Sequence, residues 1–299
     1  GPPLPPTTRP TLSEPPALAQ IGNDQVRLLL PRADYGYGIG YFQRRIDGEW
    51  QTVAALPRMS RLVVRGPDGE PDEHLVYAAS ARTVDSPEAV APEMLVRTLE
   101  LSGEVLDANG VNWRVVQTVR LRPSAEEFDI SLQATPDAAA ELLALDGPMV
   151  YAGEGAPDGT RRLDAIFPGL EWLVEGEHSS NSLDIATDHP DYIRYVPHPH
   201  MVTIPVMTAR IQPPAGHGTV VAVSWDHLAP YYGEHNRPSA AFATPDRFNG
   251  RQAGLMGVFA PSLPEYIDPN QTVAHTPLRI AAAEPVTLAA SVALLDAAT

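Results

Sequence analysis

Apolar and polar residues alternate along much of this chain with the period of two that is typical of a β-strand buried on one side only. The alternation is clearest over residues 113–122. One face of that strand would carry Trp113, Val115, Gln117, Val119 and Leu121, and the other Arg114, Val116, Thr118, Arg120 and Arg122. Similar runs predict strands at residues 25–30, 38–46, 49–56, 61–65, 74–84, 94–106, 127–134, 201–212, 219–225, 254–259, 278–282 and 286–295.

Short turn sequences separate several of these strands. Asp47-Gly48 is a two-residue hairpin turn, and residues 67–69 (Pro-Asp-Gly) and 107–110 (Asp-Ala-Asn-Gly) favour tight connections. Helical periodicity is scarce, and residues 138–145 fit either one short helix or the beginning of a strand. The pattern therefore predicts an all-β fold, an antiparallel meander with one face of each strand toward a core.

The first 22 residues differ in composition from the rest. Seven prolines among the first twenty residues indicate an extended tail or linker. Residues 23–299 are expected to form a single β-sandwich domain excised from a longer protein, with a further domain on its C-terminal side. Gly1-Pro2 resembles the remnant of a cleaved tag, so a signal peptide could have been removed, and we expect a secreted or periplasmic protein.

Composition and charge exclude several functions. All 21 basic residues are arginine and there is no cysteine, which removes Schiff-base and P-loop lysines, thiol nucleophiles and cysteine metal sites. A net charge of −16 makes nucleic acid an unsuitable partner, because phosphate binding needs a basic face. No apolar run approaches the roughly 20 residues that a membrane-spanning helix needs, so no membrane partner is expected.

Reactive residue types gather in residues 164–259. This stretch holds seven of the nine histidines and two of the four tryptophans, and many of its carboxylates fall between the predicted strands. Loops that collect such residues on a β scaffold are common places for binding or catalysis. We therefore expect the functional site here, in one loop group that ends at His200 and another that begins at Trp225.

Metal binding is one candidate chemistry in these loops. His198 and His200 are two residues apart, so on an extended segment both imidazoles would face the same side and could share a zinc ion. A third ligand would come from the second loop group: Asp226, His227, Glu234 or His235. Calcium could bind Asp184, Asp188 and Asp191. If no metal binds, the two histidines would instead cap a strand end, and the three aspartates would be solvated side chains in turns.

Acid–base catalysis is a second candidate. A histidine would protonate a sugar ring oxygen and a carboxylate would take the anomeric proton. The acid could be His178, His198, His200 or His227, and the base Glu177, Asp226 or Glu234. His198, His200, Asp226 and Glu234 form the catalytic set we select, although the spacing singles out no pair and a loop carboxylate is often only a solvated charge.

Sugar recognition is the third candidate. Aromatic rings can stack on the apolar face of a pyranose while polar side chains bind its hydroxyls. The expected ligand-binding set is Trp172, His178, Trp225, His227, Tyr231, Tyr232, His235 and Arg237. The alternative is that the tryptophans belong to the core, and for Trp113, on a regular strand, that alternative is favoured.

A resemblance to a known superfamily points the same way. Residues 112–123 (NWRVVQTVRLRP), followed by residues 128–136, resemble the long paired strands of the galactose mutarotase-like β-sandwich superfamily. Residues 167–172 (FPGLEW), 195–200 (YVPHPH) and 238–245 (PSAAFATP) are similar to bacterial proteins that carry such a sandwich ahead of a catalytic helical domain.

This resemblance implies a large two-sheet supersandwich and a carbohydrate partner, since the superfamily includes sugar epimerases and the sandwich domains of polysaccharide lyases and glycoside hydrolases. We therefore expect a carbohydrate-engaging domain of a larger bacterial polysaccharide-active enzyme. The alternatives are a self-sufficient epimerase-like or glycoside-cleaving enzyme and a structural spacer domain.

Overall fold

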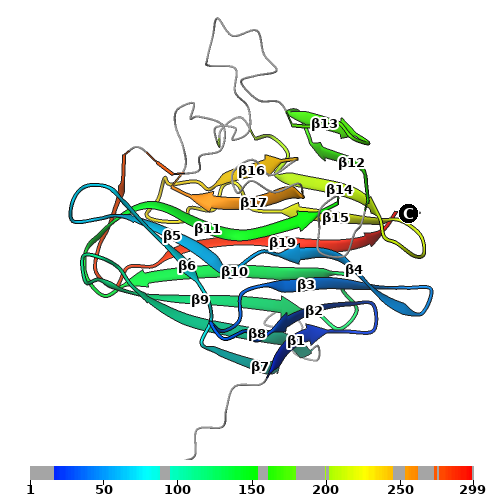
Figure 1. The fold of residues 1–299 in the computed structure, drawn as a ribbon, viewed down its shortest axis with the longest axis horizontal. Helices are drawn as coiled ribbons and strands as arrows, with labels where there is room; N and C mark the ends of the chain where they lie inside the picture. The colour runs from blue at the N-terminus through cyan, green and yellow to red at the C-terminus, as the bar shows by residue number, and fades with distance from the viewer. Residues whose placement is uncertain are drawn as a thin grey trace, which may run out of the picture.

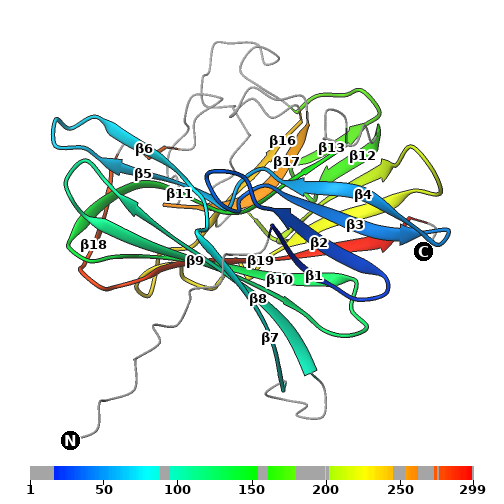
Figure 2. The same cartoon turned by 60° about the horizontal axis from the view of Figure 1, so that its bottom comes forward.

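The computed structural model describes residues 17–87, 95–153, 161–179, 199, 202–244, 253–261, 273–274 and 276–297. The described residues contain no α-helix and form two large antiparallel sheets, which confirms the expected all-β sandwich. Figures 1 and 2 show the sheets as two twisted layers. No helix that is long and apolar enough to span a membrane occurs in the described part of the chain.

The ten-stranded sheet has the order β1-β2-β3-β4-β11-β17-β16; β5 and β18 also pair with β11, and β6 pairs with β5. Its strands are β1 (Leu18–Gly22), β2 (Val26–Pro31), β3 (Gly40–Ile46), β4 (Glu49–Leu56), β5 (Ser60–Arg65), β6 (Pro71–Val76), β11 (Ala140–Ala152), β16 (Ser239–Ala243), β17 (Gly254–Ala260) and β18 (Leu278–Ile280).

The nine-stranded sheet has the order β13-β12-β14-β15-β19-β10-β9-β8-β7. Its strands are β7 (Ser80–Pro87), β8 (Leu95–Leu106), β9 (Asn112–Leu121), β10 (Glu127–Pro136), β12 (Arg161–Phe167), β13 (Glu171–Val174), β14 (Val206–Gln212), β15 (Thr219–Ser224) and β19 (Val286–Asp296). The last strand of the chain, β19, thus lies in the middle of this sheet, between β15 and β10 (Figure 1).

The main core fills the space between the sheets. On β9 the expected alternation is confirmed, because Trp113, Val115, Gln117, Val119 and Leu121 are all buried. The Trp113 indole Nε1 donates to Asp107 Oδ2 at 3.1 Å. Phe42 of one sheet and Phe128 of the other meet with ring centroids 5.4 Å apart. Burial of apolar side chains from both inner faces is what holds the layers together.

The predicted hairpin turn at Asp47-Gly48 is confirmed. Both residues have positive φ, 51° and 86°, and they connect β3 to β4. A two-residue turn with positive φ at both positions matches the right-handed twist of the flanking strands. Gly110 closes the predicted β8–β9 turn, also with positive φ.

Several elements differ from the sequence-based expectation. The strand expected at residues 74–84 is divided between β6 of the ten-stranded sheet and β7 of the nine-stranded sheet, and β16 was not expected. Strand β1 begins at Leu18, inside the segment that was assigned to the tail, and pairs with β2 along its whole length. Residues 140–152 form the long strand β11, so of the two alternatives for residues 138–145 the strand is correct; pairing with β5, β17 and β18 overrides the helix propensity of its Ala and Leu residues. Strands β12 and β13 lie where only loops were expected.

Candidate functional site

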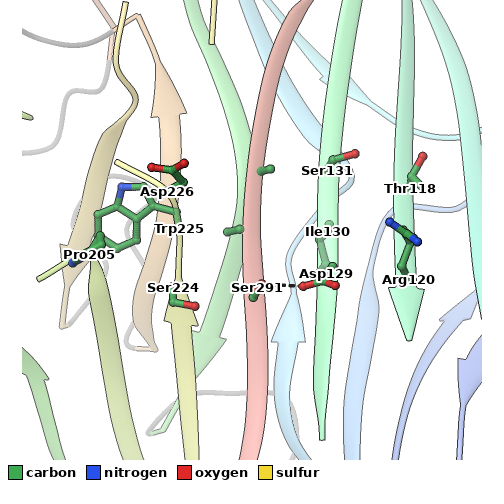
Figure 3. A pocket seen from close by; sticks show the side chains of 12 residues that line it. Thr118, Arg120, Asp129, Ile130, Ser131, Pro205, Ser224, Trp225, Asp226 and Ser291 are labelled. Carbon is green, nitrogen blue, oxygen red and sulfur yellow. Dashed lines mark hydrogen bonds between the residues drawn. The ribbon is translucent and has the colours of Figure 1, made fainter. Parts of the chain in front are cut away.

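A shallow pocket of about 550 Å³ lies on the outward face of the nine-stranded sheet (Figure 3). We call it the sheet pocket. Strands β9, β10, β19 and β15 supply most of its lining, and the remainder comes from the chain just before β14 and just after β15. Its lining residues with polar side chains are Thr118, Arg120, Asp129, Ser131, Ser224, Asp226 and Ser291.

The register of the sheet brings these polar side chains together. Ser224 pairs with Ser291, Ser291 with Asp129, and Asp129 with Arg120, which gives one row across four strands. Two residues further along the strands, Ala289 pairs with Ser131 and Ser131 with Thr118. Directly opposite residues in antiparallel strands have Cβ atoms about 5 Å apart. The two rows therefore form a compact patch of hydroxyl, carboxylate and guanidinium groups.

Hydrogen bonds fix part of this patch and leave part of it available. Ser291 Oγ donates to Asp129 Oδ1 at 2.7 Å, and Arg122 Nη1 lies 3.6 Å from Asp129 Oδ2. Within the described residues, neither Arg120 nor Thr118 has a side-chain hydrogen bond or ion pair. Figure 3 shows Thr118 and Arg120 on the same strand, beside Asp129 and Ser131. The pocket can therefore offer donors and acceptors to a polar ligand without breaking an existing ion pair of Arg120.

Trp225 forms one wall of the sheet pocket. Only 6% of it is exposed, and its ring packs edge-on against Phe167 with centroids 5.9 Å apart. Within the described part of the chain, its Nε1 has no hydrogen-bond partner. In Figure 3 the indole closes the end of the row opposite Arg120, next to Pro205. Trp225 thus combines the two roles weighed from the sequence, because it is a core side chain that also borders a pocket.

The loop after Trp225 is held mainly by its own hydrogen bonds. Asp226 Oδ1 accepts the backbone N–H groups of Leu228 at 2.9 Å and Ala229 at 3.2 Å, as in a turn cap. Tyr231 is 3% exposed, and its carbonyl accepts the N–H of Thr287 at 2.9 Å. Asp226 therefore borders the pocket with one oxygen already engaged, and the Tyr231 ring belongs to the core and offers no face to a ligand.

Tyr232 ties the same loop to the β18–β19 turn. Its hydroxyl donates to Glu284 Oε2 at 2.7 Å and accepts the N–H of Ala281 at 3.1 Å. The hydrogen bond to Glu284 is the largest cause that raises the pKa of Tyr232 above its ordinary value. These contacts give Tyr232 a structural role and do not direct its hydroxyl toward the sheet pocket.

The other expected residues of this loop do not line the sheet pocket. Glu234 and His235 are exposed, and His227 and Arg237 are half-buried. Arg237 Nη1 donates to the backbone carbonyl of Glu234 at 3.1 Å. The structure therefore brings Trp225 and Asp226 of the expected set to the pocket and leaves these four outside it.

Trp172 and His178 lie elsewhere and are both exposed. Trp172 is on the edge strand β13, with 70% of its surface open. His178 follows a turn that is fixed by the buried Arg162, whose Nη2 donates to the carbonyls of Glu175 and Glu177. Glu177 Oε2 in turn accepts the N–H of Val174 at 2.8 Å.

The expected metal sites cannot be placed. His198 and His200 lie outside the described residues, as do Asp184, Asp188 and Asp191. Among the residues that the structure does describe, no group of three His, Asp or Glu side chains could hold a metal ion. Zinc and calcium both stay predictions from the sequence.

Several pocket residues were not in the candidate set: Thr118, Arg120, Asp129, Ser131, Ser224 and Ser291. The outward polar face of residues 113–122 was visible in the sequence and includes Thr118 and Arg120. Residues 127–136 alternate in the same way, with Asp129 and Ser131 at outward positions. This alternation is the signal that could have added these two residues to the candidate site.

The fold and the pocket define a class of protein, a two-sheet antiparallel β-sandwich with an open polar pocket on one sheet face. No family model matches the chain. No curated protein matches it either.

Solved structures similar to this chain include three proteins at 9–10% sequence identity. An α-N-acetylgalactosaminidase from Bifidobacterium bifidum, in complex with GalNAc, matches 93% of this chain with a TM-score of 0.44, and this chain spans 36% of that protein. The Slr1438 protein from Synechocystis matches 97% of this chain and 100% of its own, with a TM-score of 0.41. A galactose mutarotase related enzyme from Lactobacillus acidophilus matches 93% of this chain and 97% of its own, with a TM-score of 0.39.

Ligand recognition by this chain has to be inferred from its own residues.

Proposed function

We propose that this chain is a carbohydrate-binding β-sandwich domain and that the sheet pocket is its binding site. The observation that carries the proposal is the double row of Ser, Thr, Asp and Arg side chains on rigid paired strands, bordered by Trp225 and Pro205. Sugars present several hydroxyl groups and an apolar ring face, and a few well-placed polar groups beside apolar surface suit that chemistry.

The polar set of the sheet pocket favours recognition over catalysis. Asp129 accepts a hydrogen bond from the Ser291 hydroxyl, and Asp226 accepts hydrogen bonds from two backbone N–H groups, so both carboxylates have structural partners. No histidine lines the pocket within the described residues. The catalytic pairs suggested by the sequence would combine a histidine with Glu177, Asp226 or Glu234, and neither Glu177 nor Glu234 lines this pocket.

The wider context of the proposal comes from the sequence. The superfamily resemblance supports a role as the carbohydrate-engaging domain of a larger, secreted bacterial enzyme that acts on polysaccharides. In that arrangement this domain would hold the glycan and a neighbouring domain of the same protein would carry out the reaction.

A glycan array tests the proposal with two variants of the same strand. Ser131→Tyr would fill the sheet pocket, and Gln133→Tyr places the same ring two residues along the same outward face, outside the pocket lining. We expect wild type and Gln133→Tyr to bind the same glycans and Ser131→Tyr to lose at least 10-fold in affinity.

Two results would overturn the proposal. One is that wild type binds no glycan, and the other is that Ser131→Tyr binds as well as wild type. Chromatography of the bound glycans provides a separate check, because release of shorter or epimerised products by the isolated chain would identify an enzyme instead of a binding domain.

A further inference from the structure

The exposed side chain of Trp172 is unusual for its size. Large aromatic residues stabilise folds by burial, yet 70% of Trp172 is open to solvent. Its neighbour Leu173 is buried, so Trp172 and Val174 project from the opposite, outward face of β13. Ile166, directly opposite Trp172 on β12, is also exposed. The edge of the sheet therefore carries a small aromatic and aliphatic platform.

The sheet register places this platform on the same face as the sheet pocket. A continuous row runs from Trp172 to Ile166, Thr208, Ala222 and Ala293 across five strands. The neighbouring outward row, two residues along the strands, contains Ser224 and Ser291 of the pocket. Strands β13 and β15 are three strand spacings apart, which is about 14 Å. Trp172 thus lies beyond the reach of one sugar bound in the pocket.

The surface between the two features is suited to a ligand that crosses it. The intervening outward residues of this row, Ile166, Thr208 and Ala222, carry no charge, and Thr208 and Ala222 are small. On the far side of the row, Asp164 and Arg210 neutralise each other in an ion pair. Among the described residues, a chain laid across these strands would meet no unpaired charge, and Ile166, beside Trp172, is the one large side chain in this row before it.

We propose that Trp172 is a second contact point for the same ligand, so that the chain recognises a glycan of several sugar units and not a single sugar. This inference rests on the proposed function of the sheet pocket. The pocket would hold one sugar by hydrogen bonds, and the Trp172 ring would stack on a sugar further along the glycan. We expect this additional contact to tighten binding at least about 3-fold, equivalent to about 0.7 kcal/mol.

Calorimetric titration tests the inference with β-1,4-linked galactose and glucose oligomers of one, three and six units. For wild type we expect the six-unit probe to bind at least about 3-fold more tightly than the one-unit probe. Trp172→Ala should remove that gain and leave the one-unit affinity unchanged. The matched control is Val174→Ala, on the same strand and face, which should keep the gain.

Tryptophan fluorescence gives a second readout that does not depend on measuring an affinity. Trp172 is the most exposed tryptophan, so the six-unit probe should shift wild-type emission to shorter wavelength, and the shift should be smaller in Trp172→Ala.

Equal affinity of wild type for the one-unit and six-unit probes would overturn the inference and leave the proposed function intact. So would a wild-type dimer that Trp172→Ala converts to a monomer in sedimentation, because the platform would then be a self-association surface. Absence of binding by every probe, together with a negative array, counts against the proposed function itself.

Discussion

The two sheets differ sharply in burial between β9 and β10 of the nine-stranded sheet and β16 and β17 of the ten-stranded sheet. On β9 and β10 buried and partly or fully exposed residues alternate, and the outward positions are mostly polar. On β16 and β17 every residue is buried, on both faces of the ten-stranded sheet. The nine-stranded sheet is therefore open to solvent over the sheet pocket, and the other sheet is covered around β11, β16 and β17.

The covered face has its own hydrophobic cluster, separate from the main core. Met149, Tyr151, Leu255 and Phe259 belong to it. Charged residues near it are paired: Asp146 is 2% exposed and lies 3.4 Å from Arg58 Nη2 and 3.3 Å from Arg61 Nη2. Burial lowers the pKa of the Arg61 guanidinium, but the Asp146 and Glu73 carboxylates outweigh it and hold that pKa above its ordinary value.

This difference separates structural polar groups from those available to a ligand. An ion pair inside the covered face has to be complete, because an unpaired buried charge is costly. Polar side chains of the open face stay hydrated and cost little without a ligand. Arg58, Arg61 and Asp146 therefore serve stability, and Arg120, Thr118 and Ser131 can serve binding.

The largest effect should come from aromatic residues on the two faces. Phe259 is fully buried in the covered cluster, so Phe259→Ala should lower the free energy of unfolding by about 3–5 kcal/mol. Trp172 is larger but exposed on the open face, so Trp172→Ala should change the free energy of unfolding by no more than about 0.5 kcal/mol. Urea unfolding measures both. Similar losses for the two variants would mean that the open face is also packed in solution.

Charge removal gives a second, smaller contrast. Asp146→Asn leaves Arg58 and Arg61 without their buried carboxylate. It should lower the free energy of unfolding by about 2–3 kcal/mol. This is no more than the smallest loss typical of a broken buried ion pair, because Arg61 keeps its ion pair with Glu73. Asp164→Asn breaks the exposed pair with Arg210 on the open face and should cost less than about 1 kcal/mol. Chemical denaturation at neutral pH compares them. An Asp164 variant as unstable as the Asp146 variant would contradict the proposed distinction.

The sequence predicts much of this contrast where the pattern is local. Strict alternation over residues 113–122 predicted the strand and its open face, and the uninterrupted apolar run at residues 254–259 is what a strand buried on both faces shows. Strands β12 and β13 were missed because Asp164, Glu171 and Trp172 look like loop residues. Glu171 and Trp172 lie on the edge strand β13 and Asp164 lies on its neighbour β12. Polar and charged residues are tolerated on strands that have one solvated face.

The sheet pocket was harder to predict because it depends on long-range pairing. Asp129 and Ser291 are 162 residues apart in sequence and meet only because β19 inserts between β10 and β15. No local pattern specifies that register. The loop candidates were attractive because they concentrate His, Asp and Tyr, yet Asp226 caps a turn and Tyr232 binds Glu284. The composition of the sequence shows where reactive residues are concentrated, but the pairing of the strands determines which of them lie close together.

A further small effect is predicted for a contact that joins the two sheets away from both faces. Asp72 Oδ2 on β6 accepts the N–H of Ala108, in the β8–β9 turn, at 2.8 Å, and lies 2.8 Å from His74 Nε2. Burial raises the pKa of Asp72, but these hydrogen bonds outweigh it and hold the pKa below its ordinary value of 3.8. Asp72 therefore stabilises the fold above that pH, and its contribution is lost as pH falls through the lowered pKa.

We expect the difference in unfolding free energy between wild type and Asp72→Asn to be below about 1 kcal/mol at pH 5 and to shrink as the pH falls below 3.8. Urea unfolding of both proteins at pH 5, 4 and 3 measures it. The covered and open faces should be insensitive to this change, so the cost of Phe259→Ala should be the same in the Asp72→Asn background. The prediction would be contradicted if the difference in unfolding free energy between wild type and Asp72→Asn grew as the pH fell. The pKa of Asp72 would then be raised in the folded chain and not lowered.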